Sequence, residues 1–100
     1  MKSLIRYKTK PESADDNQRL VEKVYDELNS RNPGGVHYAT LRLDDGVTFM
    51  HLFTTDSDDA ANTLGGIAAF AEFLRDLPQR CAEQPVAQPV KVVGSYRMFD

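Results

Sequence analysis

Cysteine is almost absent from this chain of 100 residues, in which Cys81 is the single thiol. A lone cysteine excludes an internal disulfide and is typical of a reducing compartment, so we expect a cytoplasmic location. Long apolar stretches are missing as well. The longest stretch without a charged residue runs from Ala60 to Ala71, which is shorter than the roughly 18 residues that span a bilayer. The first ten residues also lack the apolar region of a signal peptide, so we expect neither export nor a membrane partner.

Basic runs and cofactor motifs are missing too. With 12 Lys and Arg against 15 Asp and Glu, the formal net charge is −3, and a mildly acidic domain without a basic run is a poor candidate for binding nucleic acid. The chain contains no P-loop, dinucleotide fingerprint, nucleophile elbow or Cys-X-X-Cys pair. Its two histidines have no evident third ligand, so we expect neither a metal site nor another cofactor.

The residues that are present predict strands and helices within one domain over residues 1–100. The stretch from Ser3 to Lys10 alternates two sets of residues with the period of two that is typical of a strand, and Pro11 ends it. From Ala14 to about Ser30, apolar residues recur at helical spacing, and the following Asn-Pro-Gly-Gly ends that helix. The apolar stripe of the helix consists of Leu20, Val21, Val24, Tyr25 and Leu28.

A β-hairpin is predicted next. The stretches from Val36 to Leu43 and from Val47 to Phe53 are rich in β-branched and aromatic residues, and Asp-Asp-Gly at 44–46 separates them. Two turns fit this sequence. In the one that we favour, the three residues form a type I turn with a left-handed glycine bulge, and Leu43 lies opposite Val47. In the other, the last two residues form a type I′ turn, and position 44 lies opposite Val47.

The choice of turn decides which side chains share a face of the sheet, because side chains alternate along a strand. The favoured turn places His37 and His51 on the same mostly apolar face, which we expect to be covered by the helices. The other turn places the two histidines on opposite faces.

The rest of the chain predicts one helix and one strand. Apolar residues recur at intervals of three and four from Leu64 to Leu77, and we expect Pro78 to kink or end that helix. Pro85 and Pro89 indicate a loop, after which we expect the last strand over residues 90–99.

This order of elements, βαββαβ, predicts an α+β, ferredoxin-like fold with a four-stranded antiparallel sheet in the order 4-1-3-2 and both helices on one face. The other face then has no cover. An exposed apolar sheet face usually marks an interface, so we expect a homodimer through it. The residues expected there are Leu4, Tyr38, Met50, Leu52, Val93 and Phe99, among Arg6, Lys8, Arg42 and Arg97.

Four segments of the sequence resemble a known family. They are Leu-Ile-Arg-Tyr-Lys-Thr-Lys near the start, Leu-Asp-Asp-Gly-Val-Thr-Phe-Met-His-Leu in the hairpin, Ala-Phe-Ala-Glu-Phe-Leu in the second helix and Val-Val-Gly-Ser-Tyr-Arg near the end. Together they are similar to members of the dimeric α/β-barrel superfamily, which includes the antibiotic-biosynthesis-type monooxygenases. The resemblance implies a dimeric α/β barrel with a pocket between sheet and helices. It does not select a reaction, because the superfamily also contains isomerases, dehydratases and ligand-sensing domains.

Few residues are candidates for chemistry. His51 and His37 could act as an acid, a base or a substrate-orienting group in a pocket, or they could be strand histidines hydrogen-bonded to the backbone. Cys81 falls on an apolar helical stripe and is expected to be a core residue. The basic residues of the outer sheet face could hold an anion, although ion pairing or solvation is the better interpretation. Candidate substrate-binding residues are Tyr7, Phe53, Phe70 and Tyr96.

Two functions from different classes are compatible with these observations. The first is a non-catalytic domain that binds a small molecule or serves as an accessory module, which the lack of a compact catalytic constellation favours. The second is a cofactor-independent monooxygenase or related enzyme acting on a small aromatic substrate, which the resemblance and the aromatic, histidine-bearing face favour. The size of the pocket separates them in part, because an aromatic ligand needs roughly 300 Å³ of concave space.

Overall fold

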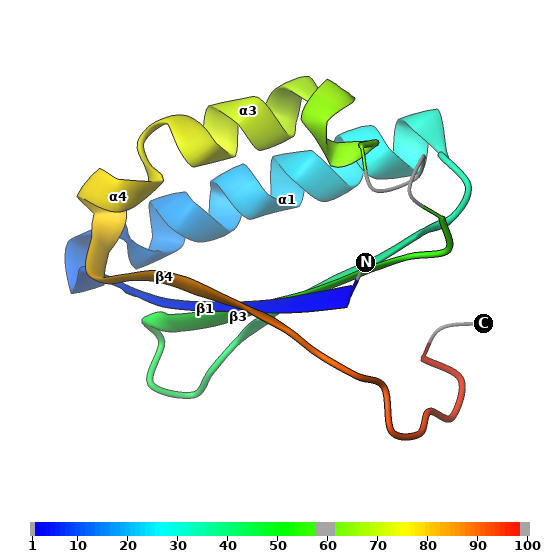
Figure 1. The fold of residues 1–100 in the computed structure, drawn as a ribbon. Coiled ribbons are helices and arrows are strands. Elements are labelled where there is room, and N and C mark those ends of the chain that lie inside the picture. The colour runs from blue at the N-terminus through cyan, green and yellow to red at the C-terminus, as the bar shows by residue number, and fades with distance from the viewer. Residues whose placement is uncertain (1, 58–61, 99–100) are drawn as a thin grey trace.

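The computed structural model describes residues 2–57 and 62–98. An antiparallel sheet in the order β2-β3-β1-β4 carries the helices on one face, which confirms the predicted α+β, ferredoxin-like topology (Figure 1). None of the helices in the described ranges is long and apolar enough to cross a membrane. The elements are β1 (Lys2–Thr9), η1 (Pro11–Ser13), α1 (Ala14–Arg31), β2 (Val36–Arg42), β3 (Thr48–Thr55), η2 (Leu64–Gly66), α3 (Ala68–Arg75), α4 (Leu77–Arg80) and β4 (Cys81–Pro89).

The first helix forms where the apolar spacing predicts it. α1 buries Val21 and Val24 against the sheet, and it ends where Asn32 adopts the left-handed conformation with φ of 48°, a conformation that asparagine tolerates better than most residues. The second helix is shorter than predicted. α3 ends at Arg75, and Pro78 occupies the first turn of α4, where its missing N–H breaks no hydrogen bond.

The favoured hairpin register is wrong. Leu43 lies opposite Thr48 rather than Val47, since its N–H donates to the Thr48 carbonyl at 2.9 Å. The N–H of Gly46 donates to the Leu43 carbonyl at 2.9 Å and closes a turn. Gly46 has φ of 77°, the left-handed conformation expected of a glycine bulge. Val47 is then an additional loop residue between the turn and β3. Its carbonyl accepts a hydrogen bond from the N–H of Thr9 at 2.8 Å. This hydrogen bond to β1 explains why the loop contains one more residue than the predicted turn.

This register shifts β2 by one residue relative to the prediction. Tyr38 pairs with Phe53 and Thr40 with His51, so their side chains share the helix-covered face. His37 pairs with Thr54 and lies on the opposite face. The two histidines are therefore separated, as in the register that we did not favour.

The last strand is also displaced from the prediction. β4 covers Cys81–Pro89, including both prolines that indicated a loop, and residues 90–98 form no strand. β4 pairs only with β1, and its register shifts between the partners of Arg6 and Lys8. An edge strand has free N–H positions on one side and tolerates a bulge, so Pro85 and Pro89 disrupt little pairing there.

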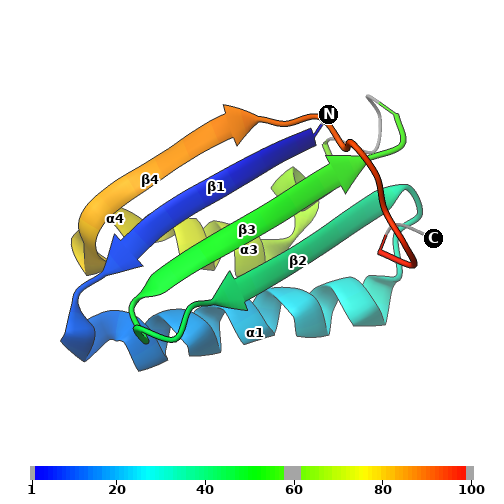
Figure 2. The ribbon, with the colours of Figure 1, turned by 90° about the horizontal axis from the view of Figure 1, so that it is seen from below.

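The face of the sheet opposite the helices differs in part from the predicted set. No helix within the described ranges covers it, and residues 90–98 cross the strand ends at one corner (Figure 2). Tyr38 and Arg42 lie on the helix side instead, where the Arg42 guanidinium contacts Asp15 and Gln18 of α1. Val93 and Arg97 belong to the segment after β4, and Phe99 lies outside the described residues.

Candidate functional site

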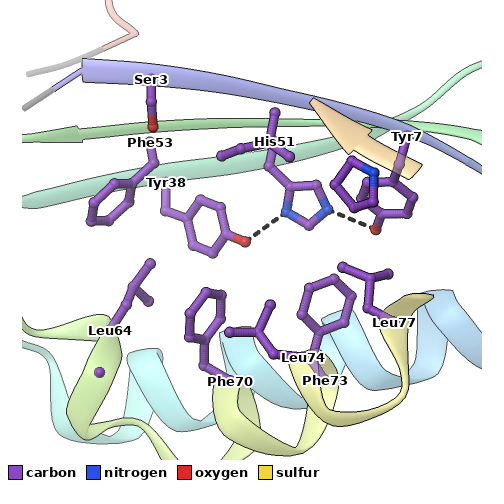
Figure 3. Close-up of a pocket in the computed structure, with 13 residues that line it drawn as sticks. Ser3, Tyr7, Tyr38, His51, Phe53, Leu64, Phe70, Phe73, Leu74 and Leu77 are labelled. Atoms are coloured by element: carbon purple, nitrogen blue, oxygen red, sulfur yellow. Dashed lines mark hydrogen bonds between the residues drawn. The ribbon is translucent and has the colours of Figure 1, made fainter. Parts of the chain in front are cut away.

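A cavity of about 410 Å³ lies between the sheet and the layer formed by η2, α3 and α4 (Figure 3). Aromatic and aliphatic side chains form most of its wall. Leu74 is 45% exposed, which marks the side on which the cavity meets the solvent. The lining residues are Ser3, Ile5, Tyr7, Tyr38, His51, Phe53, Leu64, Gly65, Phe70, Phe73, Leu74, Leu77 and Pro85.

Side chains that alternate along the strands, with a period of two, form the floor of the cavity. Ile5 of β1 pairs with His51 of β3, which in turn pairs with Thr40 of β2, so these three side chains point to the helix side in one row across the sheet. Side chains at helical spacing form the roof of the cavity. Phe70, Phe73, Leu74 and Leu77 are spaced by three or four residues and face the sheet in Figure 3.

His51 is the polar centre of the floor. It is 3% exposed, and both ring nitrogens are occupied: Nδ1 lies 2.6 Å from the Tyr38 hydroxyl and 3.1 Å from the Thr40 hydroxyl, and Nε2 lies 2.8 Å from the Tyr7 hydroxyl. Burial lowers the pKa of His51 to about 4 because the charged imidazolium loses hydration. The ring is therefore neutral at pH 7.

A chain of buried polar groups leads from His51 to a cation. The Tyr7 hydroxyl accepts a hydrogen bond from Asn17 Nδ2 at 2.8 Å, and Asn17 Oδ1 accepts one from Arg80 Nε at 3.1 Å. Arg80 also donates to the Phe73 carbonyl at 2.7 Å, and its guanidinium lies 5.3 Å from the centre of the Phe73 ring. Asn17 is 0% and Arg80 8% exposed, so both polar groups are buried within the core.

A second group of hydroxyls lies on the other side of His51. The Tyr25 and Thr40 hydroxyls are 2.7 Å apart, and the Tyr25 and Tyr38 rings are stacked with their centres 5.2 Å apart. Burial raises the pKa of the Tyr38 phenol, as it does those of Tyr7 and Tyr25, so all three keep their protons at neutral pH.

Comparison with known proteins identifies this architecture at the level of fold. No family model matches the chain, and no curated protein matches its sequence. Solved structures do match. An antibiotic biosynthesis monooxygenase aligns with a TM-score of 0.73 and 14% identity over 93% of this chain and 98% of that one. The chain has the fold of antibiotic biosynthesis monooxygenase-like proteins.

Other proteins with this monooxygenase-like fold carry no assigned reaction in their names. Rv0793 from Mycobacterium tuberculosis aligns with a TM-score of 0.74 and 12% identity over 94% of this chain and 95% of that one. NE2512 from Nitrosomonas europaea, a protein of unknown function, aligns with a TM-score of 0.73 and 11% identity over 95% and 90%. The shared fold therefore selects no reaction for this chain.

The structure brings together four of the six residues predicted for a site. His51, Tyr7, Phe53 and Phe70 all line the cavity of this monooxygenase-like fold. The other two lie elsewhere. His37 is on the outer face, with Nε2 at 3.2 Å from Asp56 Oδ1, because the register differs from the favoured one. Tyr96 is 78% exposed in the segment after β4, with the Arg97 guanidinium over its ring.

The predicted set omits several residues of the site, among them the polar residues Tyr38, Asn17 and Arg80. Tyr38 was assigned to the wrong face by the register. Asn17 and Arg80 continue the apolar stripes of α1 and of the α3–α4 segment at intervals of three and four. A polar residue at such a position indicates a buried, hydrogen-bonded group, and this pattern could have identified both residues. Cys81 is the first residue of β4 rather than part of a helical stripe. Its thiol is buried and burial raises its pKa, which fits the predicted core role.

No cluster of three potential metal ligands occurs among residues 2–57 and 62–98.

Proposed function

We propose that this protein binds a small, flat, mainly apolar molecule in the cavity between the sheet and α3. The observation that carries the proposal is a preformed space of about 410 Å³ with an aromatic wall and a few polar groups at one place. Sites for small organic ligands have volumes of roughly 300–1,000 Å³ and this same composition. A compound with one or two aromatic rings suits these dimensions.

A cofactor-independent monooxygenase acting on an aromatic substrate is the second candidate, and it would use the same cavity with His51 as its base. A general base is most effective when its pKa lies near the working pH. The pKa of His51 is lowered to about 4, and hydroxyl groups already occupy both ring nitrogens. These two properties favour binding over oxygenation.

A thermal-shift screen with one- and two-ring aromatic compounds tests the binding proposal. A ligand present at a hundred times its Kd stabilises the folded state by about 2.7 kcal/mol. This stabilisation raises the Tm of a domain of this size by about 10 °C or more. We expect Leu74→Trp to lower the affinity because it fills the open side of the cavity. Arg75→Trp, at the exposed neighbouring position, adds the same ring outside the cavity and should bind as the wild type does. A screen without any stabilising compound would contradict the proposal.

We also propose that two copies of the chain associate through the outer sheet face. Apolar side chains remain on that face, including Leu41 at 60% exposure and Val86 at 58%, and the half-buried Leu4, Met50 and Leu52. Isolated exposed apolar residues are common, but a continuous set on one face usually marks an interface. A two-fold dimer would cover the face with its own copy.

We further propose a cytoplasmic location, on the basis of the lone cysteine, whose thiol is unpaired and buried. Fractionation of cells that produce the protein tests this, and recovery from the periplasm or the medium would contradict it.

A further inference from the structure

The polar chain beneath the cavity has a defined direction, which starts at Arg80. A guanidinium can only donate hydrogen bonds, so the atom of Asn17 that faces Arg80 Nε at 3.1 Å must be the carbonyl oxygen. The amide nitrogen of Asn17 then faces Tyr7 and donates to its hydroxyl oxygen at 2.8 Å. The orientation of the amide is thus fixed by the cation.

The same reasoning assigns the proton of Tyr7. Among the described residues, this hydroxyl has two polar contacts, Asn17 Nδ2 and His51 Nε2. Since Asn17 donates, the Tyr7 proton can be satisfied only by His51 Nε2 acting as acceptor. The opposite arrangement would leave a buried hydroxyl proton without an acceptor, which costs about 1–3 kcal/mol. Tyr7 is 2% exposed, so bulk water does not offer an alternative.

His51 must then carry its single proton on Nδ1. From there it donates to the Tyr38 hydroxyl at 2.6 Å, with the Thr40 hydroxyl at 3.1 Å as a second acceptor. Tyr38 accepts from His51 and keeps its own O–H proton, which it can donate to Thr40 or to a group in the cavity. Each donor in the series polarises the next, and the series starts at a full positive charge.

Arg80 lacks an acidic counterpart at the site among the residues that the structure describes. In the described part of the chain no carboxylate forms an ion pair with it, and no Asp or Glu lines the cavity. A buried cation without a paired anion makes its surroundings electropositive. The polar end of the cavity is therefore suited to a partner that accepts a hydrogen bond.

We infer that Arg80, through Asn17 and Tyr7, fixes the proton of His51 on Nδ1 and thereby makes Tyr38 a hydrogen-bond donor that selects ligands with an acceptor oxygen. The inference rests on the proposed binding function and gives its ligand class: a flat apolar body bearing a carbonyl or a similar oxygen acceptor. Tyr38 contacts the ligand, whereas Arg80, Asn17 and Tyr7 are positioning residues.

A matched pair of probes tests the ligand class. 2-Acetylnaphthalene carries a carbonyl where 2-isopropenylnaphthalene carries a methylene group of similar shape. We expect the wild type to bind the ketone about tenfold more tightly, as one additional hydrogen bond implies. Tyr38→Phe should abolish the preference while keeping the affinity for the alkene. Tyr96→Phe, which removes an exposed hydroxyl outside the cavity, should leave the preference unchanged.

Ring ¹⁵N NMR of His51 tests the proton assignment in the unliganded wild type and does not depend on any variant folding. We expect Nδ1 protonated and Nε2 unprotonated, with Tyr7→Phe producing a mixture of tautomers and a weaker preference for the ketone. A proton on Nε2 of the wild type would overturn the inference. Equal affinity for the two probes would also overturn it but leave the binding function intact, whereas failure of both probes to bind would overturn the proposed function as well.

Discussion

At the scale of single residues, we expect His51 to make stability depend on pH because it is a titratable group in the core. The unfolded chain protonates it near its ordinary pKa of about 6.5, whereas the folded protein does so near 4. Between these values the unfolded state binds more protons. The stability contributed by the neutral histidine is therefore complete above pH 6.5 and is lost as the pH falls to 4, by about 3 kcal/mol in total.

Urea unfolding between pH 7 and pH 4 checks this expectation. The free energy of unfolding should fall across that interval, and His51→Gln should flatten the fall above pH 5, where few carboxylates titrate. The resonance of the His51 ring in the folded protein should titrate near pH 4. A midpoint near 6.5 would show that the ring is not desolvated as the structure requires.

The residues of the cavity differ in how readily the sequence predicts them. Tyr7, His51 and Phe53 follow from strand alternation, and Phe70 follows from helical spacing. Helical spacing marks Asn17 and Arg80 individually as buried positions. The hydrogen bond between them does not follow from either rule, because the two residues come from segments 63 positions apart. Only the packing of α4 on α1 brings them together, and a sequence pattern carries no information on such a contact.

At the scale of elements, the hairpin turn depends on one side chain. Asp45 Oδ1 accepts from the N–H groups of Val47 and Thr48 at 3.0 and 2.8 Å, and its other oxygen accepts from the Thr48 hydroxyl. These bonds lower the pKa of Asp45 to about 2. We expect Asp45→Ala to lower the urea midpoint more than Asp44→Ala does at the neighbouring exposed position. Equal midpoints would show that these bonds do not stabilise the turn.

The roof of the cavity depends on a contact between two helices. Glu27 of α1 accepts hydrogen bonds from the N–H groups of Ala68 and Ala69 at the start of α3, at 3.2 and 3.0 Å. This capping lowers the pKa of Glu27. We expect Glu27→Ala to speed amide hydrogen exchange in α3 and to weaken ligand binding, because an uncapped helix start frays. Glu22→Ala, at an exposed position of α1, is the control. Unchanged exchange in α3 would contradict this role.

Two elements show where sequence patterns are insufficient. Asp-Asp-Gly correctly predicts a turn and the positive φ of its glycine, yet the register depends on Val47, whose carbonyl binds Thr9 of another strand. The position of β4 likewise depends on pairing at the edge of the sheet, where Pro85 and Pro89 are tolerated. Both errors come from non-local contacts that override local propensity.

At the scale of the whole molecule, the order of strands and helices was predictable because handedness and short connections leave few arrangements for βαββαβ. That order also leaves the outer sheet face without a helix from residues 2–57 and 62–98. We expect a dimer in sedimentation at micromolar concentration and a monomer for Leu52→Asp, because an unpaired charge buried in an interface costs several kcal/mol. Ala71→Asp, exposed on α3, should remain dimeric. A wild type that sediments only at 11.2 kDa would contradict the dimer.

Intermolecular NOEs from bound 2-acetylnaphthalene test whether the cavity beneath α3 is the ligand site. We expect NOEs from the naphthalene protons to Ile5, Leu64 and Leu77, which come from the floor and the roof of the cavity. Saturable binding with NOEs only to the outer-face residues Leu41 and Val86, or no binding at any accessible concentration, would contradict the proposed site.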